Sequence, residues 1–174
     1  MHNVIAADGA DPADFRATAR AQLDAYSDVT VRDIGATAVA QDGDAFAITL
    51  ADGSTESARR VILATGVIDD LPEIPGLDRL WGVHAFSCPF CDGHEYSGRD
   101  IGILGGGMRI GHLIGLLGRI AASITVFPLT DEIADDERHA IEALGARIHS
   151  GVVDAVAQEG DVVIVNVGGD TVSL

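Results

Sequence analysis

The feature that most constrains the fold of this chain is a heptapeptide that occurs twice. Residues 38–44 and residues 155–161 share the sequence Ala-Val-Ala-Gln-Asp/Glu-Gly-Asp. An alternating, β-prone strand follows each copy, at residues 46–50 and at residues 162–167, and then another glycine turn. The sequence therefore predicts two copies of one three-stranded β-meander.

A helical pattern precedes each copy of the meander. In the first copy, Asp11 is a candidate N-cap and Pro12 suits the first helical position. The apolar residues that follow fall on one helical face, namely Phe15, Ala19, Leu23 and Tyr26. In the second copy, residues 131–144 form the helical pattern and Gly145 ends it. Helix followed by meander is therefore the predicted repeating unit.

Apolar strands with glycine turns lie next to both units. Residues 61–64 form an apolar run that reads as a buried strand ending in a glycine turn at Gly66. Residues 101–104 read as a strand that runs into Gly105, Gly106 and Gly107, before a helix expected over residues 108–121. The first unit is followed by this apolar strand and the second is preceded by the glycine loop, and neither unit has both. The sequence therefore predicts an α/β enzyme with two nucleotide-binding, Rossmann-like halves, truncated at both ends.

Two cysteines, the only ones in the chain, lie in Cys88-Pro89-Phe90-Cys91-Asp92-Gly93. A Cys-x-x-Cys pair forms and releases a disulfide readily because the second thiol lies beside the first. Asp92 adds a carboxyl group that is able to transfer a proton to a leaving thiolate. We therefore predict that Cys88, Cys91 and Asp92 form a redox-active site.

The glycine loop departs from the usual dinucleotide pattern. Its third small position is occupied by Ile110, with Gly111 one residue later. A second strand is expected over residues 123–127. No Arg or His cluster follows it to bind a 2′-phosphate, so the sequence supports nicotinamide binding only weakly.

The charge of the chain excludes several classes of partner. The 174 residues carry a formal net charge of -16, with 27 acidic and 11 basic residues. Such a surface disfavours nucleic acid and anionic membranes as partners. The sequence has no apolar run long enough for a membrane span and no signal-peptide pattern, and its two cysteines have redox spacing. We therefore expect a cytoplasmic protein.

Taken in order, four motifs resemble the thioredoxin reductase family, especially its thioredoxin-reductase-like flavoproteins and dithiol oxidases. They are Ala64-Thr65-Gly66-Val67, Leu71-Pro72-Glu73-Ile74-Pro75-Gly76-Leu77, Cys88-Pro89-Phe90-Cys91-Asp92-Gly93 and Gly105-Gly106-Gly107. The resemblance covers essentially the whole chain. It implies a flavin-dependent thiol–disulfide oxidoreductase with a disulfide or dithiol substrate, and a homodimer in the full-length enzyme.

The resemblance also implies roles for individual residues. Residues 1–75 would be the remnant of an FAD-binding domain, with Ala64, Thr65 and Gly66 along the FAD. Residues 76–174 would be an incomplete pyridine-nucleotide-binding domain that carries the redox pair, with Gly105, Gly106 and Gly107 at an NADPH phosphate, should NADPH be used. Cys88 would face the substrate, Cys91 would lie closest to the flavin, and Asp92 would be the acid/base.

Two other functional classes stay open at this stage. His84, Cys88, Cys91 and His94 have spacings that a small zinc site is able to use. The chain is also compatible with a catalytically inactive interaction module that kept the fold, because no phosphate-binding glycine motif precedes the first unit.

Overall fold

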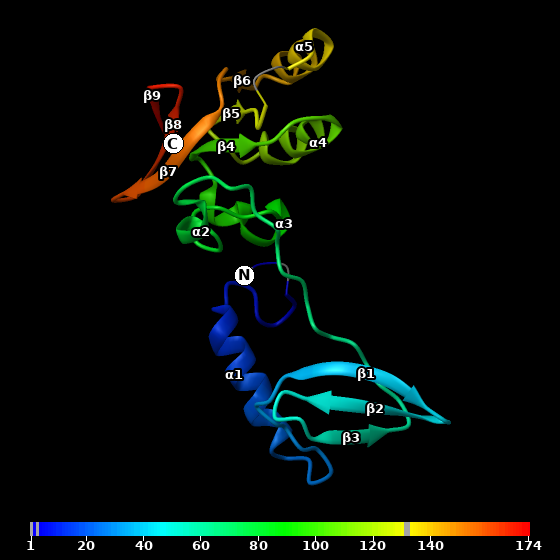
Figure 1. Ribbon diagram of the computed structural model, residues 1–174. Coiled ribbons are helices and arrows are strands. Elements are labelled where there is room, and N and C mark those ends of the chain that lie inside the picture. The colour runs from blue at the N-terminus through cyan, green and yellow to red at the C-terminus, as the bar shows by residue number, and fades with distance from the viewer. Residues whose placement is uncertain (1, 3, 131–132) are drawn as a thin grey trace. The chain divides into compact units, whose positions relative to one another are not determined.

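The computed structural model describes residue 2, residues 4–130 and residues 133–174, and shows two compact units (Figure 1). The first comprises Met1–Phe15 and Asp70–Leu174, and the second comprises Arg16–Asp69. Both contain a β-meander, and the first adds a parallel sheet with helices. The predicted α/β fold class is confirmed.

The two meanders have the same construction, as the repeated heptapeptide predicts. Each consists of three antiparallel strands with the middle strand of the sequence at the centre. The strands are β1 (Ala36–Asp42), β2 (Ala45–Leu50) and β3 (Thr55–Ala58) in the first, and β7 (Val153–Glu159), β8 (Val162–Val167) and β9 (Asp170–Ser173) in the second. Both carry a register shift near the start of the first strand.

The turns of the two meanders match in detail as well. Gly43 and Gly160 adopt left-handed backbones, with φ of 60° and 63°. Gln41 Nε2 donates a hydrogen bond to the Gly43 carbonyl over 3.2 Å, and Gln158 Nε2 donates one to the Gly160 carbonyl over 2.8 Å. Because glycine tolerates this φ at little steric cost, the Asp/Glu-Gly step fixes the position of each turn.

Helix α1 (Pro12–Leu23) begins where the sequence predicts. Asp11 Oδ1 accepts hydrogen bonds from the amides of Ala13 at 2.7 Å and Asp14 at 3.2 Å, which is an N-cap. The expected apolar face nevertheless stays exposed, and α1 has no buried residue. Within Arg16–Asp69, Leu50 is the only buried side chain, so this unit has little hydrophobic core.

The parallel sheet has the strand order β4-β5-β6. Its elements are β4 (Asp100–Leu104), α4 (Met108–Leu117), β5 (Ser123–Phe127), α5 (Asp135–Ala143) and β6 (Arg147–Ile148). The predicted strands over 101–104 and 123–127 are confirmed. Helix α4 ends before the expected residue 121, because Gly118 and the residues after it leave the helix and glycine is a poor helix former. The start predicted for α5, residues 131–132, lies outside the described residues.

The apolar side chains of this sheet and its helices form one core. Val126 on β5 has no exposed surface, and Ile110 and Ile114 on α4 and Ile141 on α5 are also buried there. Ile110 therefore occupies the third small position of the glycine motif as a core residue. Its side chain is buried in the core that the sheet shares with α4 and α5.

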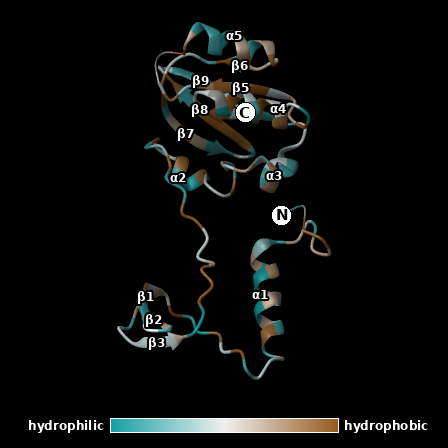
Figure 2. Ribbon diagram, turned by 90° about the vertical axis from the view of Figure 1, so that its right-hand side faces the viewer, coloured by the Kyte–Doolittle hydropathy of each residue, from teal (hydrophilic) through white to brown (hydrophobic). Residues whose placement is uncertain are grey.

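The predicted buried strand over residues 61–64 is wrong. These residues pair with no strand in the described part of the chain, and Ile62 and Leu63 are 90% and 76% exposed. Figure 2 shows the hydrophobic stretches along the extended segment that follows β3. An apolar run becomes a buried strand only when neighbouring strands and covering helices surround it, and here the run has none.

The proline-rich segment before the redox motif is anchored on the second meander. The Val156 amide donates a hydrogen bond to the Pro75 carbonyl over 2.9 Å. Gly76 follows with φ of 88°, and a Cβ at this position would lie 2.0 Å from the Val156 carbonyl oxygen. Helix α2 (Leu77–Leu80) then buries both of its leucines against β7, β8 and Phe127. This packing fixes the start of the segment that leads to the cysteines.

Candidate active site

The cysteines lie at the two ends of one helical turn. Cys88 is the N-cap of α3 (Pro89–Asp92), and a short 3₁₀ helix, η1 (Gly93–Tyr96), follows directly. Pro89 favours the helix at its first position, where no amide proton is needed. The Cys91 amide donates a hydrogen bond to the Cys88 carbonyl over 3.1 Å. The turn therefore places the second thiol beside the first.

The two thiols are not equivalent. Both are free, and Cys91 Sγ donates a hydrogen bond to Cys88 Sγ at 2.8 Å. This bond, more than any other cause, lowers the pKa of Cys88 below its usual value and raises the pKa of Cys91 to about 11. Since the thiolate is the nucleophile, the geometry favours Cys88 as the attacking sulfur.

The carboxyl group of Asp92 is adapted to holding a proton. It is half-buried, and burial followed by the charge of Glu95 raises its pKa. A carboxylic acid near a dithiol is a suitable proton donor to a leaving thiolate. The structure thus brings Asp92 together with both cysteines, as the sequence predicts.

The redox turn rests on helix α4. Gly93 is buried, and a Cβ at this position would lie 3.2 Å from Ile120 Cδ1 and 3.5 Å from Leu117 Cδ2. A larger residue there would push the turn away from α4. Close packing at Gly93 therefore fixes the thiols against the end of the helix that begins at the glycine loop.

Tyr96 supports the same turn, although no sequence pattern identifies it. Its hydroxyl donates a hydrogen bond to the Val83 carbonyl, and its ring stacks on Phe86 with centroids 5.3 Å apart. Burial, then the charges of Asp92 and Glu95, raises the pKa of Tyr96. No local motif marks this residue, because its partners lie ten or more residues earlier in the chain.

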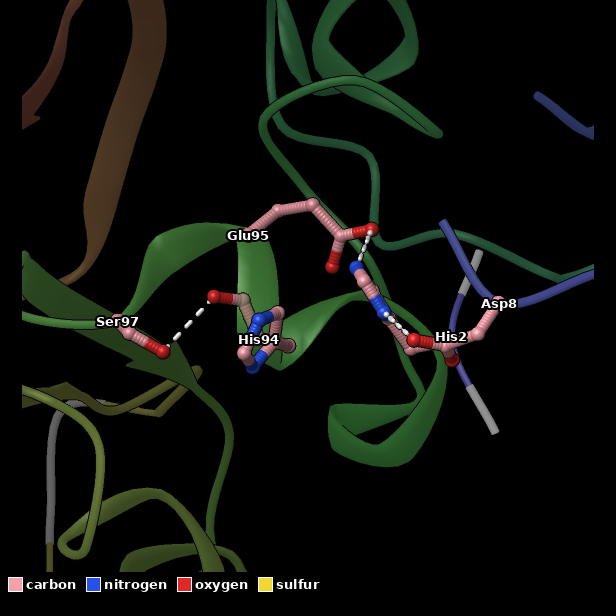
Figure 3. Close-up of polar contacts among 5 residues, drawn as sticks. All are labelled: His2, Asp8, His94, Glu95 and Ser97. Atoms are coloured by element: carbon pink, nitrogen blue, oxygen red, sulfur yellow. Dashed lines mark hydrogen bonds and ion pairs between the residues drawn. The ribbon is translucent and has the colours of Figure 1, made fainter. Parts of the chain in front are cut away.

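The two histidines of the zinc alternative have other neighbours. The His94 ring meets the His2 ring edge-on with centroids 4.4 Å apart, and the His84 ring lies against Tyr96. His2 in turn lies 3.2 Å from Asp8 and 3.4 Å from Glu95 (Figure 3). No group of three or more His, Cys, Asp or Glu in the described part of the chain has a metal-binding arrangement. The structure gives the zinc alternative no support.

The glycine loop connects β4 to α4 at the carboxyl edge of the parallel sheet. Gly105 and Gly107 have φ of 149° and 80°, which side chains rarely adopt, and open space lies where their Cβ atoms would be. The Gly105 amide is held by the Phe127 carbonyl at 3.0 Å. A backbone without side chains at a helix N-terminus fits a phosphate group.

An acidic side chain already contacts this loop. The Gly107 amide donates a hydrogen bond to Glu137 Oε1 of α5 over 2.5 Å. No sequence motif predicts this contact, because 30 residues separate the two partners.

The segment assigned to the flavin forms no enclosed site of its own. Ala64, Thr65 and Gly66 are exposed, and Thr65 Oγ1 reaches only the neighbouring Gly66 carbonyl, at 3.5 Å. Within the described part of the chain, these residues are not brought together with other candidate cofactor-binding groups. Their role along FAD stays a prediction.

Known proteins resemble this chain in sequence and in fold, although no family model matches it. Thioredoxin reductase aclD of Aspergillus oryzae is 35% identical over 152 residues, which are 82% of this chain and 48% of that protein. An oxidoreductase from Agrobacterium tumefaciens is 29% identical with a TM-score of 0.84, over 98% of this chain and 57% of its own. Over most of its length, the chain is therefore similar in sequence to the thioredoxin reductase family.

A solved structure of lower sequence identity also shares the fold. The putative thioredoxin reductase TrxB from Bacillus anthracis has a TM-score of 0.90 at 22% identity, and the match covers 98% of this chain and 59% of that one. The family resemblance inferred from the motifs is confirmed. The chain spans only part of the length of these relatives, 48% of aclD and 59% of TrxB. In the described residues, no helix has the length and apolar character needed to cross a membrane.

Proposed function

We propose that this chain carries the dithiol centre of a flavin-dependent thiol–disulfide oxidoreductase, of either the thioredoxin reductase or the dithiol oxidase type. The observation that carries this proposal is the position of the two thiols, whose sulfur atoms lie 2.8 Å apart across one helical turn. At this separation, the second thiol is able to attack a mixed disulfide formed at the first.

The exchange step uses the two cysteines of this chain and a substrate disulfide. Cys88 thiolate attacks one sulfur of a substrate disulfide, the substrate S–S bond breaks, and a mixed disulfide forms with release of the first substrate thiolate. Cys91, on losing its proton, then attacks Cys88 Sγ and releases the second substrate thiol. The substrate gains two electrons, one proton from Cys91 and one proton from solvent, and the cysteine pair becomes a disulfide. Run in reverse, a substrate dithiol reduces the pair.

Asp92 is suited to the proton movements in this exchange. The released thiolate needs a proton and Cys91 must lose one before it attacks. Because burial raises its pKa, Asp92 accepts and returns a proton more readily near neutral pH than an exposed aspartate does. We assign Asp92 as the acid/base of the site.

Two cofactors follow from the family, and the chain fits them to different degrees. When bound, FAD supplies the two-electron exchange with a dithiol. Residues 64–66 do not enclose a group in this structure, so no step is assigned to them. The shape of the glycine loop fits a dinucleotide phosphate, which supports residues 105–107 as an NADPH site. A domain division near residue 75, a homodimer of the full-length enzyme and a cytoplasmic location also belong to this proposal.

Thiol exchange in the isolated chain tests the proposal. The reduced chain is mixed with an aromatic disulfide that releases a coloured thiolate, and the products are identified by mass spectrometry. We expect the parent chain to release two thiolates and to end as an internal disulfide. Cys91→Ser should release one thiolate and retain a mixed disulfide at Cys88. Ser97→Ala, on the same segment, should react like the parent chain, whereas attack mainly at Cys91 would refute the assignment.

A further inference from the structure

We propose that Glu137 occupies the phosphate position of the glycine loop and thereby opposes dinucleotide binding in this chain. The inference rests on the proposed role of residues 105–107 as a nucleotide-phosphate site. It adds a residue, outside the motif and on another helix, that sets whether the loop accepts a ligand.

The contact has the geometry of a bound anion. Glu137 Oε1 accepts the Gly107 amide proton over 2.5 Å, and Gly107 is the N-cap of α4. The same oxygen lies 4.0 Å from the position that a Cβ on Gly106 would take. The carboxylate therefore lies over the loop at the end of α4 where backbone N–H groups and the helix dipole attract negative charge.

Helix α5 holds Glu137 in this place. Glu137 is in the first turn of α5, which packs against α4, and Ile141 one turn later is buried in the shared core. Glu137 itself is half-buried. None of the ion pairs among the described residues includes Glu137. Its carboxylate instead accepts the hydrogen bond from the Gly107 amide. Core packing of Ile141 thus holds the helix that places Glu137 beside the loop.

A dinucleotide has to displace this carboxylate. Its diphosphate would require the same Gly107 amide, and it would bring further negative charge beside Glu137. The ligand therefore gains a hydrogen bond only at the expense of an existing one, and repulsion adds to that cost. Removal of the charge should strengthen the binding of phosphate-containing ligands about tenfold or more, since one charge-assisted hydrogen bond is at stake.

Titration of the purified chain with NADPH, and separately with inorganic pyrophosphate, tests this proposal by calorimetry. Glu137→Gln keeps the size of the side chain and removes its charge, whereas Glu137→Ala removes the acceptor as well. Glu142→Gln is the matched control, because it removes the same charge from an exposed position on the same helix. We expect both Glu137 variants to bind each probe about tenfold more tightly than the parent chain. The control should bind like the parent.

Equal binding by the parent chain and Glu137→Gln would overturn the proposal, as would equal improvement in Glu142→Gln. If no variant binds either probe, the loop is not a phosphate site and the inference also fails. Disulfide exchange at Cys88 is assayed separately, so that this failure is distinguishable from failure of the proposed function.

A second measurement does not depend on any ligand. The Gly107 amide proton should resonate far downfield in the parent chain, because it is held by a carboxylate, and should move upfield in Glu137→Gln. An unchanged Gly107 resonance would contradict the contact itself.

Discussion

Cys91 Sγ donates a hydrogen bond to Cys88 Sγ over 2.8 Å, across the single turn of α3. The bond stabilises the thiolate of Cys88 and holds the proton on Cys91, whose pKa rises to about 11. The pair therefore consists of one sulfur with a lowered pKa and one that keeps its proton to higher pH. The different pKa values of the two thiols follow from the Cys-x-x-Cys turn, which places one thiol within hydrogen-bonding distance of the other.

Removal of the donor should weaken the nucleophile. In Cys91→Ala, the pKa of Cys88 should rise, because the hydrogen bond that contributes most to lowering it is lost. The rate of alkylation of Cys88 by iodoacetamide at pH 7 should fall several-fold relative to the same residue in Cys91→Ser, whose hydroxyl still donates. The pH dependence of alkylation, followed by mass spectrometry, measures this effect. Identical profiles for the two variants would show that the bond does not control Cys88.

Asp92→Asn should raise stability in a pH-dependent manner. The folded chain holds the Asp92 proton to higher pH than the unfolded chain does, because burial raises the pKa. The stabilisation due to this proton is complete below the unfolded pKa of an aspartate, about 3.9, and is lost as pH rises through the folded value. The amide side chain of the variant carries no such charge, so its melting temperature should exceed that of the parent modestly at pH 7 and approach it at pH 4. A lower melting temperature at pH 7 would contradict this account.

Gly76→Ala should destabilise the unit that contains the redox turn. The added Cβ would lie 2.0 Å from the Val156 carbonyl oxygen, at a left-handed φ of 88°. Overpacking and backbone strain together should lower the free energy of unfolding by about 3 kcal/mol or more. Gly82→Ala is the control, since Gly82 has φ of 77° but open space around it, and should cost about 1 kcal/mol from strain alone. Denaturant unfolding of both variants measures the difference, and equal losses would argue against the close contact at Gly76.

The exposed apolar segment after β3 should promote self-association. Ile62, Val67 and Ile68 are at least 90% exposed, and unpaired extended backbone beside apolar side chains favours strand pairing between chains. The charge of -16 opposes this pairing, but salt screens it within about 10 Å.

Sedimentation velocity should therefore show larger species as salt is raised, and fewer of them in the Ile62→Asp variant. Ile5→Asp is the control, because it makes the same change at another exposed residue. A monomer at all salt concentrations would contradict the prediction.

Local signals were sufficient to predict most of the fold. The Asp/Glu-Gly turns at Gly43 and Gly160 determine where the first two strands of each meander turn, and Asp11 determines the start of α1. Alternating or continuous apolar residues predict β5 and β8. The apolar run at residues 61–64 was misleading, because its pattern describes a strand that only neighbouring strands are able to bury. The exposure of the apolar face of α1 was not predictable either, because helical periodicity identifies an apolar face but not the element that would cover it.

The candidate site was predictable only in part. The cysteines and Asp92 are adjacent in sequence, so their proximity follows from one turn of helix. Glu137 and Tyr96 act at distances of 30 and 13 residues along the chain from their partners. Only the packing of α5 on α4 and of η1 beneath the redox turn brings such residues into place, and no local pattern encodes that packing.

The redox competence of Cys88 and Cys91 is the central claim, and equilibration in glutathione buffers of graded potential tests it most directly. Mass spectrometry of acid-quenched samples should show one transition, in which the chain loses two hydrogen atoms and both thiols together, and dithiothreitol should reverse it. Cys88→Ser and Cys91→Ser should each yield only a single mixed disulfide with glutathione. Two thiols that stay free in oxidised glutathione, or two glutathione adducts on one parent chain, would contradict the claim.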